Sequence, residues 1–444
     1  MNRVYGKAKN AKTASIIFSS TNTEKKNSVL KRVAMLLNEK RQPLLEANAV
    51  DLENAEQLLK EGKLNNALIK RLKLTSEKID EIIEGVKSVA GQEELTGKTL
   101  STLELDKGLE LYRVSVPIGV ICCIFESRPD ALVQISSLCI KSGNAVILKG
   151  GSEALETNRF LFNLIRQCLE EEKLDKEALQ LIETRADVKE ILDLDGLIDL
   201  IIPRGSNSFV KFIQENTRIA VLGHASGICH VFVDKEADLC KAEKICFDAK
   251  TQYPAVCNAM ETMLVHSAVA KEFLPKVCKK LIESGVKLFA DKEALVILKE
   301  NNLAAEQAKQ ENWSTEYNDL ILNVRIVNCL DEAISHINQF GSRHTDSIVS
   351  EDKERSLKFI NMVDSSSVMV NASTRFSDGY RYGLGAEVGI NTGKIHTRGP
   401  SGLESLLTYK YILVGQGNIV ADYSGKDAKK FSHKKLEKEW NSGY

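Results

Sequence analysis

The run VPIGVICCIF, residues 116–125, decides the fold. It is about half of the ~20 apolar residues that span a bilayer, so it predicts a buried strand and not a membrane anchor. Similar strands are expected at 145–149, 197–203, 219–223 and 229–234, with helices around 130–141, 153–172 and 207–216. Continuous apolar strands separated by helices predict a parallel sheet covered on both faces, which is typical of a nucleotide-binding α/β domain.

A second, shorter α/β series begins near residue 249. Its strands are expected at 262–266, 324–328, 346–350 and 366–372, and its helices at 267–284, 331–340 and 351–363. A chain of 444 residues also exceeds what one hydrophobic core usually organises. The fold class is therefore α/β, with two doubly wound domains.

Residues 99–116 alternate apolar and polar side chains around Asp106-Lys107-Gly108, which predicts a β-hairpin. Residues 21–93 before it are expected to be mainly helical, and a hairpin that leaves such a helical body is often an oligomerisation arm. We expect a nucleotide-binding domain over 1–98 and 117–248, a catalytic domain over 249–400, an arm region over 99–116 and 401–420, and a polar tail over 421–444. The lysine-rich tail favours a solvated helix or a frayed end.

The composition excludes several classes of protein. With 43% hydrophobic residues, 27% charged residues and a net charge of -1, nothing indicates nucleic acid or an anionic membrane as a partner. The N-terminus lacks the pattern of a secretory signal, so a cytoplasmic location is expected. The ten cysteines include no C-x-x-C pair and the histidines no i,i+4 pair, which predicts reduced thiols and no metal site.

One cysteine has a distinctive setting. Cys257, in TQYPAVCNAMETMLVH (251–266), lies between a proline turn and what reads as the start of a helix. Unpaired backbone N–H groups at such a junction would lower the thiol pKa and hold an oxyanion. The alternative is a buried structural cysteine, because free cysteines are among the most buried residues.

Two strand-to-helix turns suggest a nucleotide site. Lys149 ends the run AVILK and is followed by two glycines, and Arg204-Gly205-Ser206 follows the strand LIDLIIP and precedes a helix. A lysine at the carboxyl end of such a strand faces the ligand crevice of a doubly wound sheet, and a helix N-terminus can meet a phosphate. Each turn alone could be a plain β–α connection, but two in one sheet are more telling.

Two glycine-rich stretches are candidates for ligand binding. GLGAEVG (383–389) imitates a dinucleotide fingerprint, but its spacing is one residue too long and no strand-to-helix context surrounds it. His396 and Arg398, in KIHTRGPSGLE, lie in a loop rich in cationic groups that could hold an anionic substrate. A plain surface loop is the alternative for this second stretch.

Taken together, these segments of the sequence resemble the γ-glutamyl phosphate reductase family of the aldehyde dehydrogenase superfamily. The most specific blocks are VPIGVICCIFESRPDA, SLCIKSGNAVILKGGSEALETN, IDLIIPRGS, AKTQYPAVCNAMETMLVH, VNASTRFSDGYRYGLGAEVGI and HTRGPSGLESLLTYKY. The resemblance implies an aldehyde-dehydrogenase-like fold and Cys257 as the catalytic thiol. It also implies NADPH contacts by Lys149, Gly205, Ser206 and, in a weaker match, Asp319. Arg128 falls where many relatives place an oxyanion-hole asparagine.

One departure from the superfamily bears on the reaction. Hydrolytic members carry a glutamate before a Gly-Gly pair, whereas this chain reads VLGHASGICH there. Since a thioester must survive until hydride arrives, the missing base favours reduction of an acyl phosphate. The resemblance thus implies NADPH-dependent reduction of L-glutamyl 5-phosphate to L-glutamate 5-semialdehyde, in proline biosynthesis. Alternatives are another acylating or an ordinary aldehyde dehydrogenase, or a catalytically silent paralogue that acts as a binding protein.

The expected roles at the site complete the prediction. Backbone N–H groups near Cys257 and the side chain of Asn258 would stabilise the oxyanion. The candidates for holding the amino-acid head of glutamyl phosphate are Arg128, Arg375, His396 and Arg398. A homo-oligomer is expected, and so is functional coupling to a glutamate kinase.

Overall fold

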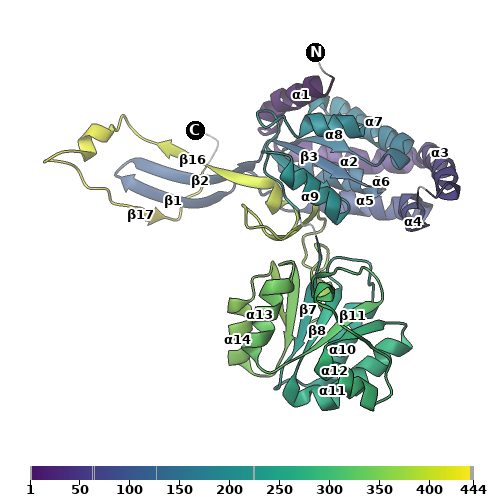
Figure 1. Cartoon of the computed structure of the whole chain (residues 1–444). Coiled ribbons are helices and arrows are strands. Elements are labelled where there is room, and N and C mark those ends of the chain that lie inside the picture. Colours follow the sequence, from purple (N-terminus) through teal and green to yellow (C-terminus); the bar gives the residue numbers. More distant parts are fainter. Residues whose placement is uncertain (1–2, 63, 65, 127, 224–225, 441–444) are drawn as a thin grey trace.

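The computed structural model describes residues 3–62, 64, 66–126, 128–223 and 226–440. Residues 1–2 begin the predicted nucleotide-binding domain and residues 441–444 end the predicted polar tail. Both stretches lie outside the described residues. The chain forms two α/β lobes, one above the other, and a β arm that projects from the upper lobe (Figure 1). Among the described residues, no helix combines the length and the apolar character needed to cross a membrane.

The first lobe is built around the predicted sheet. Its four parallel strands have the order β5-β4-β3-β6, with β3 spanning Val120–Phe125, β4 Ala145–Lys149, β5 Leu179–Leu181 and β6 Leu200–Arg204. Every residue of β3 is buried, because helices cover both faces of the sheet. The predicted strand at 219–223 is reduced to a single bridge between Val221 and Ile201.

The helices of the first lobe come from both sides of the arm in sequence. They are α1 Arg3–Phe18, α2 Thr23–Glu39, α3 Arg41–Lys60, α4 Asn66–Leu72, α5 Ser76–Gly91, α6 Pro129–Ser142, α7 Leu155–Glu171, α8 Arg185–Ile191 and α9 Asn207–Glu215. The apolar faces of α2 and α5 join the core that surrounds β3. The helical N-terminal segment is therefore an integral layer of this lobe.

The second lobe carries a seven-stranded parallel sheet in the order β10-β9-β11-β8-β7-β12-β13. Its strands are β7 Cys229–Val233, β8 Met260–His266, β9 Lys287–Ala290, β10 Glu306–Gln307, β11 Ile321–Val327, β12 Thr345–Val349 and β13 Ser367–Val370. The helices are α10 Leu239–Thr251, α11 Ser267–Glu283, α12 Lys292–Glu300, α13 Leu330–Phe340 and α14 Lys353–Met362.

The boundary between the lobes differs from the sequence prediction. The strand expected at 229–234 was grouped with the first sheet, but β7 pairs with β8 and β12 in the second. The second sheet therefore begins at Cys229 and not after residue 248. An apolar strand pattern indicates burial but does not indicate which of two sheets the strand joins.

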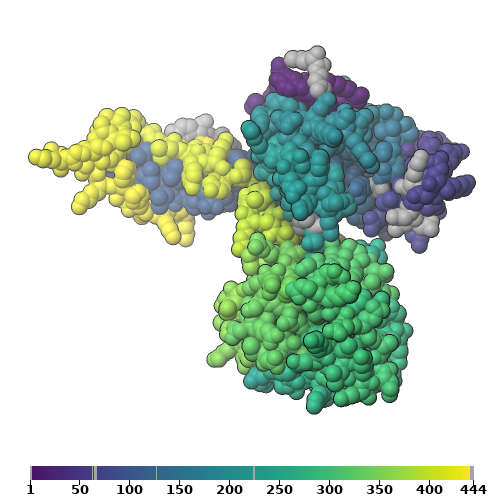
Figure 2. Space-filling model, viewed as in Figure 1, coloured from purple at the N-terminus to yellow at the C-terminus, as the bar shows by residue number. Residues whose placement is uncertain are grey.

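The arm is a four-stranded antiparallel sheet in the order β16-β2-β1-β17. The predicted hairpin forms β1 Thr99–Asp106 and β2 Leu109–Pro117, and β16 Leu407–Val414 pairs along β2. The space-filling view shows this arm standing clear of both lobes along most of its length (Figure 2).

The tail is the second difference from the sequence prediction. Instead of a solvated helix or frayed end, it returns to the arm, where β17 Lys434–Leu436 pairs with β1. The ring of Trp440 packs edge-on against Tyr112, with 5.4 Å between ring centroids. Lysines in an edge strand keep its outer face in water, so the composition that suggested disorder also suits this position.

Candidate active site

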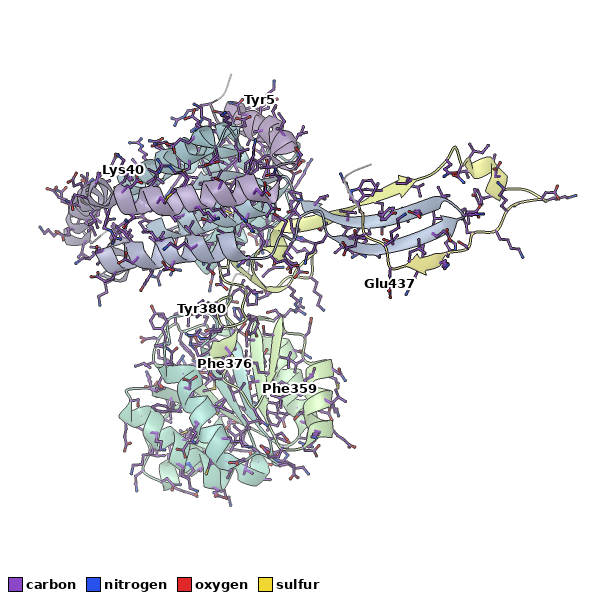
Figure 3. The ribbon with its side chains drawn as sticks, turned by 180° about the vertical axis from the view of Figure 1, so that it is seen from behind. Tyr5, Lys40, Phe359, Phe376, Tyr380 and Glu437 are labelled. Atoms are coloured by element: carbon purple, nitrogen blue, oxygen red, sulfur yellow. The ribbon has the colours of Figure 1, made fainter. Side chains whose placement is uncertain are left out.

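A cavity of about 1210 Å³ lies where the two lobes face each other. The first lobe contributes the turn after β6, and the second lobe contributes Val256, Cys257 and Asn258. The segment 375–390 closes the wall between them. Tyr380 of this segment is labelled at the junction of the lobes, with Phe376 close by (Figure 3).

Cys257 lies in a tight turn directly before β8. The Ala259 N–H donates to the Val256 carbonyl at 3.0 Å, and the strand begins at Met260. The helix predicted after the thiol is therefore wrong, and a strand follows the turn. Among the described residues, the backbone N–H groups of Cys257 and Asn258 have no acceptor other than the Cys257 sulfur itself, toward which the Cys257 N–H is directed. The turn thus keeps two free donors beside the thiol without a helix N-terminus.

The backbone at Gly227 packs directly against the Cys257 turn. A Cβ atom at Gly227 would lie 2.1 Å from the carbonyl oxygen of Cys257 and 2.4 Å from its Cα, far inside any real contact. Glycine at position 227 is therefore required by the close approach of two backbone segments. The buried Cys229 thiol donates to the same Cys257 carbonyl at 3.2 Å.

A histidine that sequence reasoning did not single out contacts the thiol. His344 Nε2 lies 3.1 Å from Cys257 Sγ, and its Nδ1 lies 2.8 Å from Thr345 Oγ1. The imidazole is fully buried and immediately precedes β12. If Nδ1–H donates to the threonine hydroxyl, Nε2 is the acceptor for the thiol proton. Nothing in the sequence marks this contact, because only the fold brings residues 257 and 344 together.

The electrostatics also differ from the expectation of an acidic thiol. Burial, together with the nearby carboxylates of Glu316 and Glu387, raises the pKa of Cys257 to about 12, although the backbone N–H of Cys257 and Arg375 act to lower it. The free thiol is therefore protonated at neutral pH, and forming the thiolate requires a proton acceptor. His344 is the group in hydrogen-bonding contact with the thiol that has this capacity.

Asn258 is turned toward the supporting structure. Its Nδ2 donates to the Ser377 carbonyl at 2.8 Å and the side chain is buried. Its Oδ1 has no partner among the described residues. Since the amide donor is engaged in tying the turn to segment 375–390, the free backbone N–H groups are better placed than this side chain to hold an oxyanion.

The first lobe presents the predicted nucleotide turn to the same cavity. Gly205 and Ser206 line it, and α9 begins at the next residue. Ser206 makes no side-chain cap bond to the helix. Asn207 Nδ2 donates to Glu316 Oε2 at 2.7 Å, across from the first lobe to the second. An exposed, uncapped helix start at a parallel-strand end suits a dinucleotide phosphate.

Comparisons with known proteins agree with this architecture. Residues 2–294 match the sequence model of the Aldehyde dehydrogenase family. The γ-glutamyl phosphate reductase of Methanosarcina acetivorans is 56% identical over 429 residues, covering 96% of each chain. That of Acetivibrio thermocellus is 51% identical over 429 residues, covering 97% of each. The chain is a γ-glutamyl phosphate reductase family member, within the aldehyde dehydrogenases.

Solved structures extend the likeness to three dimensions. The γ-glutamyl phosphate reductase of Thermotoga maritima superposes with a TM-score of 0.90 at 38% identity, over 94% of this chain and all of that one. A glyceraldehyde-3-phosphate dehydrogenase, GapN, from Methanocaldococcus jannaschii, complexed with NADP, shares the fold with a TM-score of 0.65 at 16% identity, over 93% of this chain and 94% of that one. As aldehyde dehydrogenases use nicotinamide cofactors, the cavity's first-lobe side is the candidate cofactor side.

The predicted cofactor residue Lys149 lies at the carboxyl end of β4, on the same sheet edge as Gly205. Burial lowers the pKa of Lys149, and the neighbouring carboxylates of Glu153 and Glu126 counteract that shift. Lys149 does not line the cavity, but it interacts with Glu126, which does. A lysine and an uncapped helix start on this edge have the chemistry to hold the phosphates of a nicotinamide dinucleotide.

Asp319 is less well placed for a cofactor than the sequence suggested. It is exposed, does not line the cavity, and its carboxylate accepts from the Leu320 N–H. Glu316, three positions earlier, lines the cavity instead and bridges to Asn207. The loop before β11 is irregular, so spacing alone could not choose between two acids in it.

The four candidates for substrate binding separate into two pairs. Arg128 and Arg375 line the cavity. His396 is exposed, with Nε2 2.9 Å from the Ser405 carbonyl, and Arg398 Nη1 donates to Asp364 Oδ1 at 2.9 Å. Neither of these two lines the cavity, so the structure does not bring them together with the thiol.

The discounted stretch 383–389 forms no phosphate-binding turn, but it does line the cavity. It contributes Gly385, Ala386 and Glu387, and the Gln92 amide donates to the Leu384 carbonyl at 2.6 Å. Glu387 Oε2 accepts from the Gly379 N–H at 2.8 Å. Among the described residues, no cluster of three or more His, Cys, Asp or Glu side chains could hold a metal ion.

Proposed function

We propose that this chain reduces L-glutamyl 5-phosphate to L-glutamate 5-semialdehyde and phosphate, using NADPH, in the second step from glutamate to proline. The observation that carries the proposal is the Cys257 thiol, 3.1 Å from an imidazole nitrogen, in a cavity that reaches the Gly205–Ser206 turn. The names of the relatives, at up to 56% identity over nearly the whole chain, support the same reaction.

The first step is activation of the thiol. His344 Nε2 takes the Sγ proton, and the positive imidazole is stabilised because its Nδ1–H donates to Thr345 Oγ1. The thiolate attacks the acyl carbon, a C–S bond forms, and the bond from that carbon to the phosphate oxygen breaks. Phosphate leaves with the bonding electron pair and takes up a proton from solvent, and the product is a thioester on Cys257.

The tetrahedral oxyanion forms beside the turn. The free backbone N–H groups of Cys257 and Asn258 are the donors that we assign to it. A well-placed donor of this kind contributes ~3–4 kcal/mol in related acyl chemistry. Asn258 contributes indirectly, since its bond to Ser377 holds the turn in place.

The cofactor side is assigned to three residues. Lys149 would contact the ribose 2′-phosphate, which gives the preference for NADPH, and Gly205 and Ser206 would meet the pyrophosphate. When bound, NADPH supplies the hydride that reduces the thioester to the aldehyde. His344 then returns its proton to Cys257 Sγ as the C–S bond breaks.

Water must be kept from the thioester. Val221 occupies the segment where hydrolytic relatives carry the glutamate base. The two carboxylates near the thiol are engaged elsewhere, Glu316 by the Asn207 amide and Glu387 by the Gly379 N–H. This arrangement leaves phosphate, and not water, as the partner of the thioester in the reverse reaction.

The deciding experiment is the reverse assay. Reduction of NADP⁺ by glutamate semialdehyde should depend on added phosphate. Coenzyme A dependence would indicate an acylating dehydrogenase, and turnover with neither acceptor would indicate an ordinary one. A chain that binds no NADPH in a fluorescence titration would instead be the silent paralogue.

The assembly and the supply of substrate are part of the proposal. The strand β16, at one edge of the arm, exposes Tyr409, Tyr411 and Leu413, which supports pairing with another copy in a homo-oligomer. An acyl phosphate is short-lived in water, so a glutamate kinase must act close by, and functional coupling to it is expected. A cytoplasmic location stays a prediction of the sequence.

A further inference from the structure

A second cavity, of about 520 Å³, opens beside the one that holds the thiol. Its floor is the apolar face of α5, including Ile82, Val86 and Val89. It contacts neither Cys257 nor the Gly205–Ser206 turn, so it extends away from the cofactor side. Its volume is in the range of small-molecule sites.

The residues where the two cavities meet are mainly polar. Arg71, Arg128, Asp130 and Gln134 line both cavities, together with Tyr253 and three small residues. A ligand that reacts at Cys257 and extends away from the cofactor therefore reaches these side chains. Of these, Arg71 comes from α4, and Arg128, Asp130 and Gln134 come from the start of α6 and its first turns, in the first lobe.

The charges at this junction suit a zwitterion. Among the described residues, the guanidinium groups of Arg71 and Arg128 have no hydrogen-bond or ion-pair partner. Lys78, by contrast, donates its ammonium to the carbonyls of Lys70 and Lys73, which ties the end of α4 to α5. Within the described part of the chain, the Asp130 carboxylate likewise has no hydrogen-bond or ion-pair partner. Two guanidiniums beside one carboxylate are complementary to a carboxylate next to an ammonium.

We infer that this junction binds the α-amino and α-carboxylate groups of the glutamyl substrate. Arg71 and Arg128 take the carboxylate, Asp130 takes the ammonium, and the methylene chain runs toward Cys257. The inference rests on the proposed function for the identity of the substrate. It replaces His396 and Arg398, which point to other partners, with residues that face the cavity.

Three aldehydes test the inference in the reverse assay with phosphate. Glutamate semialdehyde has both head groups, glutarate semialdehyde lacks the ammonium, and pentanal lacks both. Arg128→Gln should raise KM for glutamate semialdehyde about tenfold or more, while kcat/KM for pentanal and KM for NADP⁺ stay within about twofold. Asp130→Asn should weaken glutamate semialdehyde but not glutarate semialdehyde.

Lys87→Gln is the matched control, since Lys87 lies on α5 outside the cavity and pairs with Glu84. It should leave all three aldehydes unchanged. An equal loss with all three aldehydes in Arg128→Gln, or no change with any, would overturn the assignment.

A binding measurement separates this inference from the proposed reaction. L-glutamate should bind the wild-type chain in calorimetry, and Arg71→Gln should weaken it about tenfold or more. If none of the aldehydes is turned over but this binding behaves as expected, the proposed reaction fails and the head-group site stands. Absence of L-glutamate binding to the wild-type chain, or equal binding by Arg71→Gln, contradicts the site itself.

Discussion

The two lobes face the shared cavity with opposite ends of their strands. In the first lobe, Phe125, Lys149 and Arg204 end β3, β4 and β6, so the carboxyl ends point toward it. In the second lobe, Cys257 and His344 precede β8 and β12, so the amino ends do. The first arrangement follows the general rule for ligand crevices in parallel sheets, and the second does not.

The two edges also differ in how firmly their residues are held. Gly205 and Ser206 are exposed, and the helix that follows is uncapped. The thiol turn is fixed by the Gly227 backbone, the Cys229 thiol and the bond from Asn258 to Ser377. A cofactor that binds and leaves needs an open edge, whereas covalent chemistry needs a nucleophile held in one geometry.

The largest effect is expected at the thiol itself. Cys257→Ala should lower kcat by about 10⁴-fold or more, because a covalent nucleophile cannot be replaced, while NADPH affinity stays unchanged. Steady-state kinetics and a fluorescence titration check both halves. Activity within about tenfold of wild type would remove Cys257 from the mechanism, and Cys246→Ala, in the buried core, serves as the control.

Loss of the base is expected to cost somewhat less. His344→Ala should lower kcat about 10²–10⁴-fold. Because the pKa of Cys257 is raised to about 12, its thiolate fraction falls tenfold for each pH unit below that value. Alkylation of Cys257 in the variant should therefore rise about tenfold per unit from pH 7 to pH 10, without a plateau. A plateau near pH 7 would show that the thiol is acidic without His344, and His433→Ala, in the arm, is the control.

The backbone behind the thiol provides the next test. Gly227→Ala should displace the Cys257 turn, since its Cβ would overlap the Cys257 carbonyl, and lower kcat about 10²-fold. NADPH binding, on the other lobe, should persist. Gly6→Ala, with nothing within 4 Å of the added Cβ, is the matched control. Equal losses of kcat and NADPH affinity would mean that the two edges are not independent.

The smallest effect is expected at the proposed nucleotide-binding edge of the first lobe. Lys149→Ala should weaken NADPH about tenfold to a hundredfold relative to NADH, since a charge-assisted contact of ~1.5–3 kcal/mol is lost only with the 2′-phosphate. Titration of both nucleotides measures it. An equal loss for the two would show that Lys149 does not contact the phosphate.

The sequence predicted local structure better than long-range placement. The apolar runs located β3, β4, β6, β8, β11 and β12, because burial on both faces leaves a continuous apolar pattern. The same pattern could not show which sheet β7 joins. The high lysine content of the tail predicted a solvated or frayed segment, whereas part of it forms the strand β17. Such choices depend on partners distant in the chain.

The candidate site shows the same limit. Cys257 and the Gly205–Ser206 turn stood out because each has a local signature, and both line the cavity. His344 has no such signature, since its role depends on a contact that spans 87 positions. The thiol pKa shows the same limit. The local turn suggests a lowered pKa, but burial and two carboxylates that are distant in sequence and close in space raise it.

The central claim, a thioester on Cys257 that phosphate but not water resolves, is tested most directly by a single-turnover measurement. Glutamate semialdehyde and NADP⁺ are mixed with the chain in phosphate-free buffer, and NADPH is followed by absorbance. We predict a burst of one NADPH per active site that then stops, absent in Cys257→Ala, with steady turnover once phosphate is added. Continued NADPH formation without phosphate, or the absence of a burst in the wild-type chain, would contradict the account.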